Sequence, residues 1–220
     1  MPDWHDVQRS AEERYRDGEQ RLPEDRDARQ RQLTRMGNAA GAAGLSLLMA
    51  GDTAVAGKWF ARAADRYRES YADAPPGSWG RPIGAMKSRI LAGDWDGATR
   101  DAEWALGEGP TEADSPIGHY AAALALLTLG RWEEARVVAD GLRTHDAFPT
   151  DVADALAYIA GEDPVGYVEA VESVLESFEK RDAYLEDIPV ADTVIVLQAL
   201  AARRGIADAE LESPLLPASS

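Results

Sequence analysis

The chain of 220 residues contains no cysteine. This absence excludes a disulfide framework, a thiol nucleophile and thiolate metal sites. The sequence also lacks any run of about 18 apolar residues, which is the length a helix needs to cross a bilayer. Segment 1–20 is charged where a secretory signal has an apolar core. These absences predict a soluble, cytoplasmic protein.

Lysine is scarce, with three residues among 23 basic ones, and the 39 acidic residues bring the formal net charge to −16. Such a chain is not expected to bind nucleic acid or an anionic membrane nonspecifically, because both are polyanions. Two interpretations of the acidity stay open. It is a composition typical of salt-loving or GC-rich organisms, or it is a surface that meets a basic partner.

Catalytic and metal-binding motifs are also missing. The three histidines fall on different segments, at His5, His119 and His145. None belongs to a His-Glu-x-x-His motif, and neither a phosphate-binding glycine loop nor a Gly-x-Ser-x-Gly motif occurs. Glu186, Asp187 and Asp192 match no calcium loop, and Asp187 is expected near a helix start, where a carboxylate complements the helix dipole. We therefore expect no catalytic residue, no metal and no cofactor.

Apolar residues recur at helical spacing along almost the whole chain, and no stretch alternates with period two. This pattern predicts an all-α protein of about ten helices. Proline is expected in the first turn of four helices, at Pro82, Pro116, Pro164 and Pro189. Three residues are expected N-caps, namely Ser115, Thr150 and Asp163.

Aromatic residues and the chain end lead to further expectations. Trp59, Phe60 and Tyr67 share one helical stripe and are predicted core residues. Trp79 lies in the loop 73–80, outside any stripe, where it either packs over a helix end or is available to a partner. The tail is expected either to pack as an extended strip through Leu215 and Leu216 or to fray.

Internal repetition is the strongest pattern. The tripeptide Pro-Ile-Gly occurs at 82–84 and again at 116–118, an offset of 34 residues. Glycine-centred turns recur at Gly51, Gly93, Gly130 and Gly161. Gly93 and Gly130 are each followed by tryptophan two residues later and by alanine five residues later.

This spacing resembles the tetratricopeptide repeat over roughly 45–179, although the fourth turn keeps only its glycine. The resemblance implies a right-handed solenoid of antiparallel helical hairpins with a concave groove for a protein or peptide. It also implies that Trp95 and Trp132, at the repeat turns, pack within the molecule. We expect one domain over 1–205, in which an atypical helix pair (1–50) precedes the repeat hairpins (51–181) and a capping helix (189–204). A tail (206–220) follows.

Lys87 is the clearest anomaly. The expected helix 82–92 buries Ile83, Met86 and Ile90, and Lys87 lies at the edge of that face. The repeat alignments place it opposite apolar residues. Either it extends to a nearby carboxylate, or it accepts an anion in the groove. The candidate groove residues are Trp79, Arg81, Lys87, Arg89, His119 and Tyr120.

The function expected from these features is a non-enzymatic module that binds a protein or peptide and exists as a monomer or weak homodimer. An alternative comes from the run 187–205 together with 212–217, which resembles the end of some all-helical immunity proteins of bacterial polymorphic-toxin systems. On that alternative the chain neutralises a toxin. A small-molecule binder or a hydrolase is a third possibility.

Overall fold

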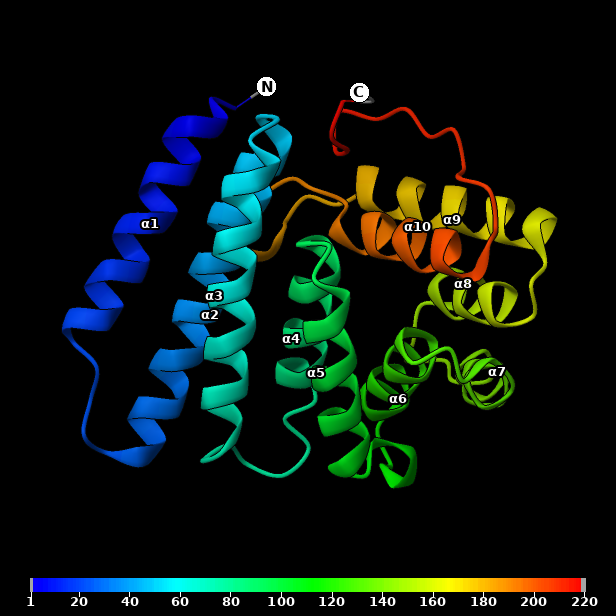
Figure 1. Cartoon of the computed structure of the whole chain (residues 1–220), viewed down its shortest axis with the longest axis horizontal. Coiled ribbons are helices and arrows are strands. Elements are labelled where there is room, and N and C mark those ends of the chain that lie inside the picture. Colours follow the sequence, from blue (N-terminus) through cyan, green and yellow to red (C-terminus); the bar gives the residue numbers. More distant parts are fainter. Residues whose placement is uncertain (1, 219–220) are drawn as a thin grey trace. The chain divides into compact units, whose positions relative to one another are not determined.

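The computed structural model describes residues 2–218 (Figure 1). Over that range the chain forms ten α-helices and two 3-10 turns and no strand, which confirms the all-α class and the expected number of helices. The elements are α1 (Trp4–Gln20), α2 (Arg26–Met49), α3 (Thr53–Tyr71), α4 (Gly80–Leu91), α5 (Trp95–Gly107), η1 (Pro110–Glu112), α6 (Pro116–Thr128), α7 (Trp132–Leu142), α8 (Thr150–Ala160), α9 (Pro164–Glu179), η2 (Leu185–Asp187) and α10 (Asp192–Arg204).

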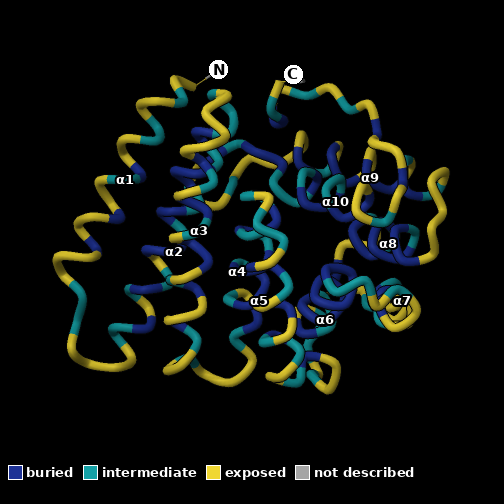
Figure 2. The backbone as a smooth tube through the Cα atoms, viewed as in Figure 1, coloured by how far each residue is buried: buried dark blue, intermediate teal, exposed yellow. Residues whose placement is uncertain are grey.

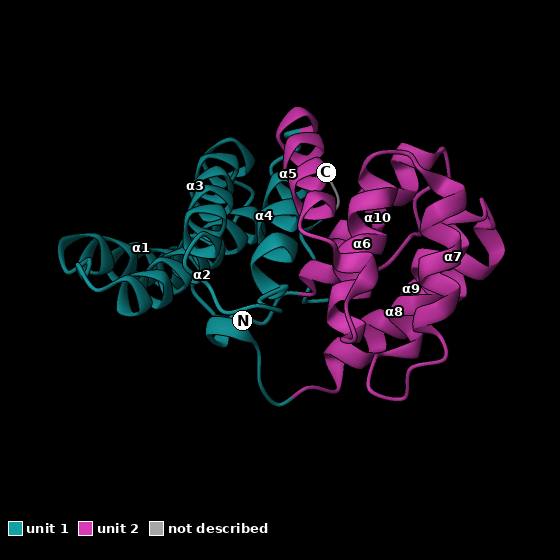
Figure 3. Cartoon of the chain, turned by 90° about the horizontal axis from the view of Figure 1, so that it is seen from below, with its two compact units in different colours: residues 1–94, 182–190, 213–220 teal, residues 95–181, 191–212 magenta. Residues whose placement is uncertain are grey.

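Contacts divide the chain into two compact units, coloured separately in Figure 3. Unit 1 contains Met1–Asp94, Asp182–Val190 and Ser213–Ser220, and unit 2 contains Trp95–Arg181 and Ala191–Glu212. Each unit is described by itself. The expected single domain over 1–205 and its solenoid order stay predictions.

In unit 1, helices α1 to α4 pack in chain order, each against the next. Glycines of α2 let aromatic rings of α3 approach closely. A Cβ added to Gly44 would lie 2.6 Å from the ring of Phe60, and a Cβ added to Gly37 would lie 2.9 Å from the ring of Tyr67. Both pairs are seven residues apart, or about two helical turns, so the contact is repeated along the two helices. Phe60 and Tyr67 are buried, as is Trp59, which confirms the predicted aromatic core.

In unit 2, α5 to α9 follow one another in the same way, and α10 packs against α8 and α9. Helix α6 is buried along most of its length (Figure 2). The last turn of α10 covers two helix starts, because Arg203 stacks 4.6 Å from the ring centroid of Trp95 and Arg204 stacks 4.7 Å from that of Trp132. Arg204 also pairs with Glu162 at 2.9 Å. The predicted packing of both tryptophans within the molecule is confirmed.

Of the four glycine-centred turns, the last differs from the others in the backbone conformation of its glycine. Gly51, Gly93 and Gly130 adopt left-handed backbone angles, with φ of 87°, 68° and 70°. Only glycine takes this conformation without strain at a helix end. Gly161 instead has an ordinary φ of −78°, and the next residue, Glu162, carries the left-handed angle.

Two predicted N-caps are confirmed and one is wrong. The side chain of Ser115 accepts a hydrogen bond from a backbone N–H of α6, and that of Asp163 accepts two from α9. Thr150, by contrast, is the first residue of α8, and Pro149 occupies the N-cap position. Pro149 already has the extended ψ of 115° that ends a loop, so the helix begins at Thr150, one residue earlier than the cap preference suggested.

Other helix starts also moved. Helix α4 begins at Gly80, two residues before Pro82. Proline is tolerated at this position because the first N–H groups of a helix have no partner within it, so the missing N–H of Pro82 breaks no hydrogen bond. Pro189 precedes α10, which begins at Asp192. Asp187 is not a helix cap, since it lies in η2 with a left-handed φ of 58°. In the tail, Leu215 and Leu216 are buried, so this segment packs rather than frays, but it does so through a turn at 214–215 and not as the expected extended strip.

Candidate functional site

Two predicted groove residues at the start of α4 turn inward. Trp79 is only 7% exposed, so the packed alternative holds, and its ring is not an exposed anchor for a partner. Arg81 crosses to α2, where its Nε donates to Thr34 Oγ1 at 3.1 Å and its guanidinium donates to the side-chain oxygen of Gln30. Burial lowers the pKa of Arg81. Arg81 therefore links α4 to α2 within unit 1, and the buried ring of Trp79 is not available to a partner.

Arg89 and Lys87 lie further along α4. Arg89 forms ion pairs with Asp65 at 2.5 Å and with Asp94 at 3.4 Å, and its side chain is 15% exposed. Its charge is therefore compensated within unit 1. Lys87 is half-buried beside the buried face that holds Ile83 and Met86. Its assignment as an anion acceptor stays a prediction.

His119 and Tyr120 belong to unit 2, near the start of α6. The ring centroid of His119 lies 5.8 Å from that of His145, and the ring centroid of Tyr120 lies 5.4 Å from that of Phe148. Both partners come from the loop between α7 and α8, so these residues cover that loop. The six predicted groove residues are thus divided, four in unit 1 and two in unit 2.

A different hollow lies in unit 2, where α5, α6 and α7 meet η1. We call it the α7 groove, and its volume is about 430 Å³. Its apolar lining consists of Leu106, Leu126, Val137 and Val138, and its polar lining of Thr111, Arg131 and Glu134. Leu126 is 2% exposed and forms the base, whereas Val137 is 73% exposed at the edge. An apolar surface is thus open to solvent in a concave position.

The polar edge of the α7 groove is an ion pair at the start of α7, between the N-cap residue Arg131 and Glu134 of the first turn. Arg131 Nε lies 2.8 Å from Glu134 Oε1, and Arg131 Nη2 lies 2.5 Å from Oε2. The hydrogen bonds between them lower the pKa of the Glu134 carboxyl and raise the pKa of the Arg131 guanidinium. Because both side chains are exposed, the pair contributes little to stability. It does neutralise both charges at the edge.

Three further carboxylates belong to residues that are close in sequence to the lining: Glu108 follows Leu106 by two positions, Glu112 follows Thr111, and Glu133 precedes Glu134. All three are exposed. Glu108 accepts a hydrogen bond from the indole of Trp104 at 3.0 Å, and Glu112 accepts one from Thr111 at 3.0 Å. Within residues 2–218, none of the three carboxylates forms an ion pair. Their negative charges are therefore not compensated locally.

The sequence did not predict this groove, although α7 carries one indication of it, an apolar residue outside the buried face of the helix. Its buried face consists of Ala135, Ala139 and Leu142, at helical spacing. Val137 does not fit that face, so a β-branched apolar residue is left on the solvent side of the helix. Its neighbours Leu106 and Leu126 come from other helices, and only the folded chain brings them to the same place.

Comparisons with known proteins give no match: neither a protein-family model, nor a curated protein, nor a solved structure is similar to this chain. Within the part of the chain that the structure describes, no three His, Asp or Glu side chains are arranged to hold a metal ion. None of the described helices combines the length and apolar character that a membrane span requires.

Proposed function

We propose that this chain is a non-enzymatic protein-binding scaffold that receives apolar side chains of a protein or peptide partner in the α7 groove. The observation that carries the proposal is the contrast between Leu126, buried at the base, and Val137, 73% exposed at the edge. Covering such apolar surface removes it from water, which favours association by about 25 cal/mol for each Å².

The size and chemistry of the α7 groove fit this role. A volume of about 430 Å³ lies in the usual range for binding sites, about 300–1,000 Å³. The polar groups at the edge are a threonine hydroxyl and an internally neutralised ion pair, Arg131 with Glu134. They suit a hydrogen-bonding rim around an apolar contact, which is the usual anatomy of a protein interface.

Site-specific photo-cross-linking tests the proposal. A photoreactive amino acid is placed at position 137, and at position 165 as a control, in the chain expressed in its native host. Val165 is a matched control because it is also exposed (71%) but lies on α9, outside the α7 groove. We expect a discrete protein adduct from position 137, none from position 165, and loss of the adduct when Val138→Asp is added.

Two outcomes would refute this function. Equal adducts from positions 137 and 165 would mean that the α7 groove is not a preferred contact. Absence of any adduct from position 137, with the labelled chain folded and expressed, would mean that no partner occupies it.

A further inference from the structure

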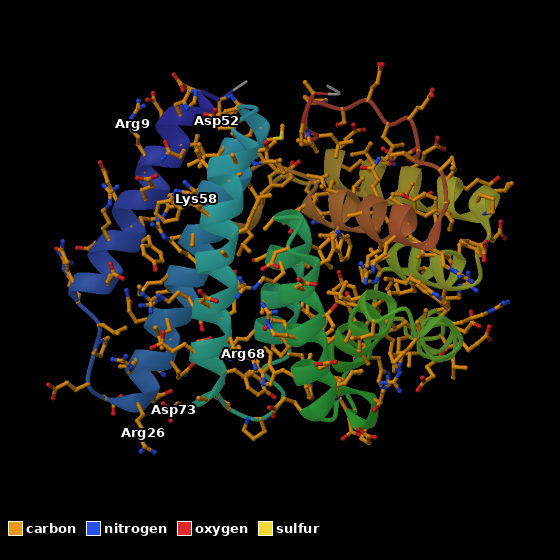
Figure 4. All side chains as sticks on the ribbon, in the orientation of Figure 1. Arg9, Arg26, Asp52, Lys58, Arg68 and Asp73 are labelled. Atoms are coloured by element: carbon orange, nitrogen blue, oxygen red, sulfur yellow. The ribbon has the colours of Figure 1, made fainter. Side chains whose placement is uncertain are left out.

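The acidity of this protein is concentrated in one unit. Unit 2 contains 22 acidic and 8 basic residues, a net charge of −14, whereas unit 1 contains 17 acidic and 15 basic residues, a net charge of −2. Together they account for the total of −16. Exposed charges of both signs are mixed on unit 1, as Arg9, Arg26, Asp52 and Lys58 show (Figure 4).

This division favours the second interpretation of the acidity, a surface that meets a basic partner, over a composition typical of the host. The units have nearly equal size, 111 residues in unit 1 and 109 in unit 2. An adaptation to the salt of the host would affect both units alike, because they share one solvent. A difference of 12 charges between −14 and −2 instead indicates a role specific to unit 2.

The same excess is present at the α7 groove itself. Arg131 compensates only Glu134, and the exposed carboxylates of Glu108, Glu112 and Glu133 each belong to a residue within two positions of a lining residue. At physiological ionic strength the Debye length is about 8 Å. A residue within two positions of a lining residue has its backbone within about 7 Å of it, so these carboxylates attract cationic side chains of a segment bound in the groove.

We propose that the occupant of the α7 groove is a basic segment of a partner protein. Its apolar side chains pack against Leu106, Leu126 and Val138, while its lysines or arginines interact with Glu108, Glu112 and Glu133. This inference rests on the proposed function and adds the chemical class of the partner. Complementary charge would speed the encounter, and the apolar contact would provide most of the affinity.

The charge distribution also disfavours other occupants. Nucleic acids and anionic membranes would be repelled by a unit of net charge −14. A second copy of this chain would bring a second acidic unit 2 toward the first one, unless it used a different face. A basic segment is the occupant for which both the apolar hollow and its charged edge are favourable.

Two synthetic peptides probe the inference on the full-length protein. Both place leucines at the same positions of an amphipathic helix, and one carries lysine on its polar face where the other carries glutamate. Fluorescence anisotropy measures their dissociation constants at about 0.15 M and about 1 M salt. We expect the lysine peptide to bind, the glutamate peptide to bind at least tenfold more weakly, and higher salt to weaken the lysine peptide at least tenfold.

Matched variants separate the α7 groove from the general acidity of the unit. The groove variant is Glu108→Gln/Glu112→Gln/Glu133→Gln. The control variant, Glu169→Gln/Glu172→Gln/Glu210→Gln, removes the same number of exposed, unpaired carboxylates from α9 and the following tail. We expect the groove variant to weaken lysine-peptide binding about tenfold and the control variant less than twofold.

The apolar contact has its own pair of variants, Val137→Gln in the groove and Val165→Gln on α9. Both replace an exposed valine, so neither is expected to change the fold. Val137→Gln should weaken the lysine peptide at least threefold, and Val165→Gln should leave it unchanged.

The inference is overturned if the two triple variants weaken the lysine peptide equally, since binding would then follow the charge of the whole unit. It is also overturned if both peptides bind equally, or if only the glutamate peptide binds. A position-137 cross-link combined with preference for the glutamate peptide would retain the docking function and refute the basic partner. Absence of the cross-link refutes the docking function itself.

Discussion

The ring of Tyr67 lies between two glycines of neighbouring helices, and this arrangement makes a precise prediction about stability. An ideal Cβ at Gly37 of α2 would lie 2.9 Å from Tyr67 Cε1, and one at Gly84 of α4 would lie 2.7 Å from Tyr67 Cε2. Tyr67 is buried, and its hydroxyl donates to Asn38 Oδ1 at 2.8 Å. The ring therefore cannot move away from both glycines at once.

Two opposing effects determine the result of Gly37→Ala. Alanine in a helix interior is favoured over glycine by about 1 kcal/mol. A methyl group forced into a packed core costs about 1–3 kcal/mol. We therefore expect Gly37→Ala to lower the free energy of unfolding by about 1 kcal/mol, with Gly84→Ala similar. Gly41→Ala, in the same helix α2 but with nothing within 4 Å of the new Cβ, should raise it by about 0.5–1 kcal/mol.

Urea denaturation of the three alanine variants measures these changes, because a shift in midpoint with an unchanged slope reports stability directly. The essential result is a change of sign within one helix, with Gly37→Ala below the wild type and Gly41→Ala above it. A double-mutant cycle identifies the cause: in a Tyr67→Leu background, Gly37→Ala should lose most of its cost.

Equal stability of Gly37→Ala and Gly41→Ala would refute the reasoning, because it would mean that the ring of Tyr67 gives way without loss. A cost of Gly37→Ala that persisted in the Tyr67→Leu background would show that another neighbour causes it.

Three further predictions concern buried groups, caps and charge. The hydroxyl of Tyr167 is buried with no hydrogen-bond partner among the described residues, so Tyr167→Phe should leave the free energy of unfolding unchanged or raise it by up to about 1 kcal/mol in urea denaturation. Tyr67→Phe loses the hydrogen bond to Asn38 and should lower the free energy of unfolding by about 1 kcal/mol. A Tyr167→Phe variant less stable than Tyr67→Phe would contradict both expectations. Asp163→Ala removes the two cap hydrogen bonds of α9 and should cost about 1 kcal/mol, whereas Glu169→Ala on the exposed side of α9 should change stability by less than about 0.5 kcal/mol. The melting temperature should rise between dilute buffer and about 1 M salt, because screening relieves the repulsion within unit 2; a flat or falling curve would contradict this.

The sequence alone determined the class of the protein and most of its helices. Helical periodicity, prolines in first turns and polar caps depend on residues within a few positions of one another, so they can be recognised before folding. The buried aromatic residues of α3 and the glycine turns at Gly51, Gly93 and Gly130 followed from the same local patterns. Helix starts moved by one to three residues where a proline or a cap preference competed with the conformation of the preceding loop, as at Thr150.

Only the tertiary structure decided the environment of each candidate residue. The sequence left two roles open for Trp79 and placed Arg81 in the groove. The structure shows that Trp79 is buried and that Arg81 hydrogen-bonds to Thr34 and Gln30 of α2, which are 47 and 51 residues away in the chain. Such partners depend on which helices become neighbours, and no local pattern carries that information.

The α7 groove and the division of charge have the same origin. Leu106, Leu126 and Val137 lie on three helices and form one surface only after α5, α6 and α7 pack together. The sequence determined the total charge of −16, but only the boundaries of the units showed that −14 of it belongs to unit 2. Periodicity acts over a few residues, whereas a surface is assembled from segments distant in the chain, and for that reason the fold class could be predicted and the candidate site could not.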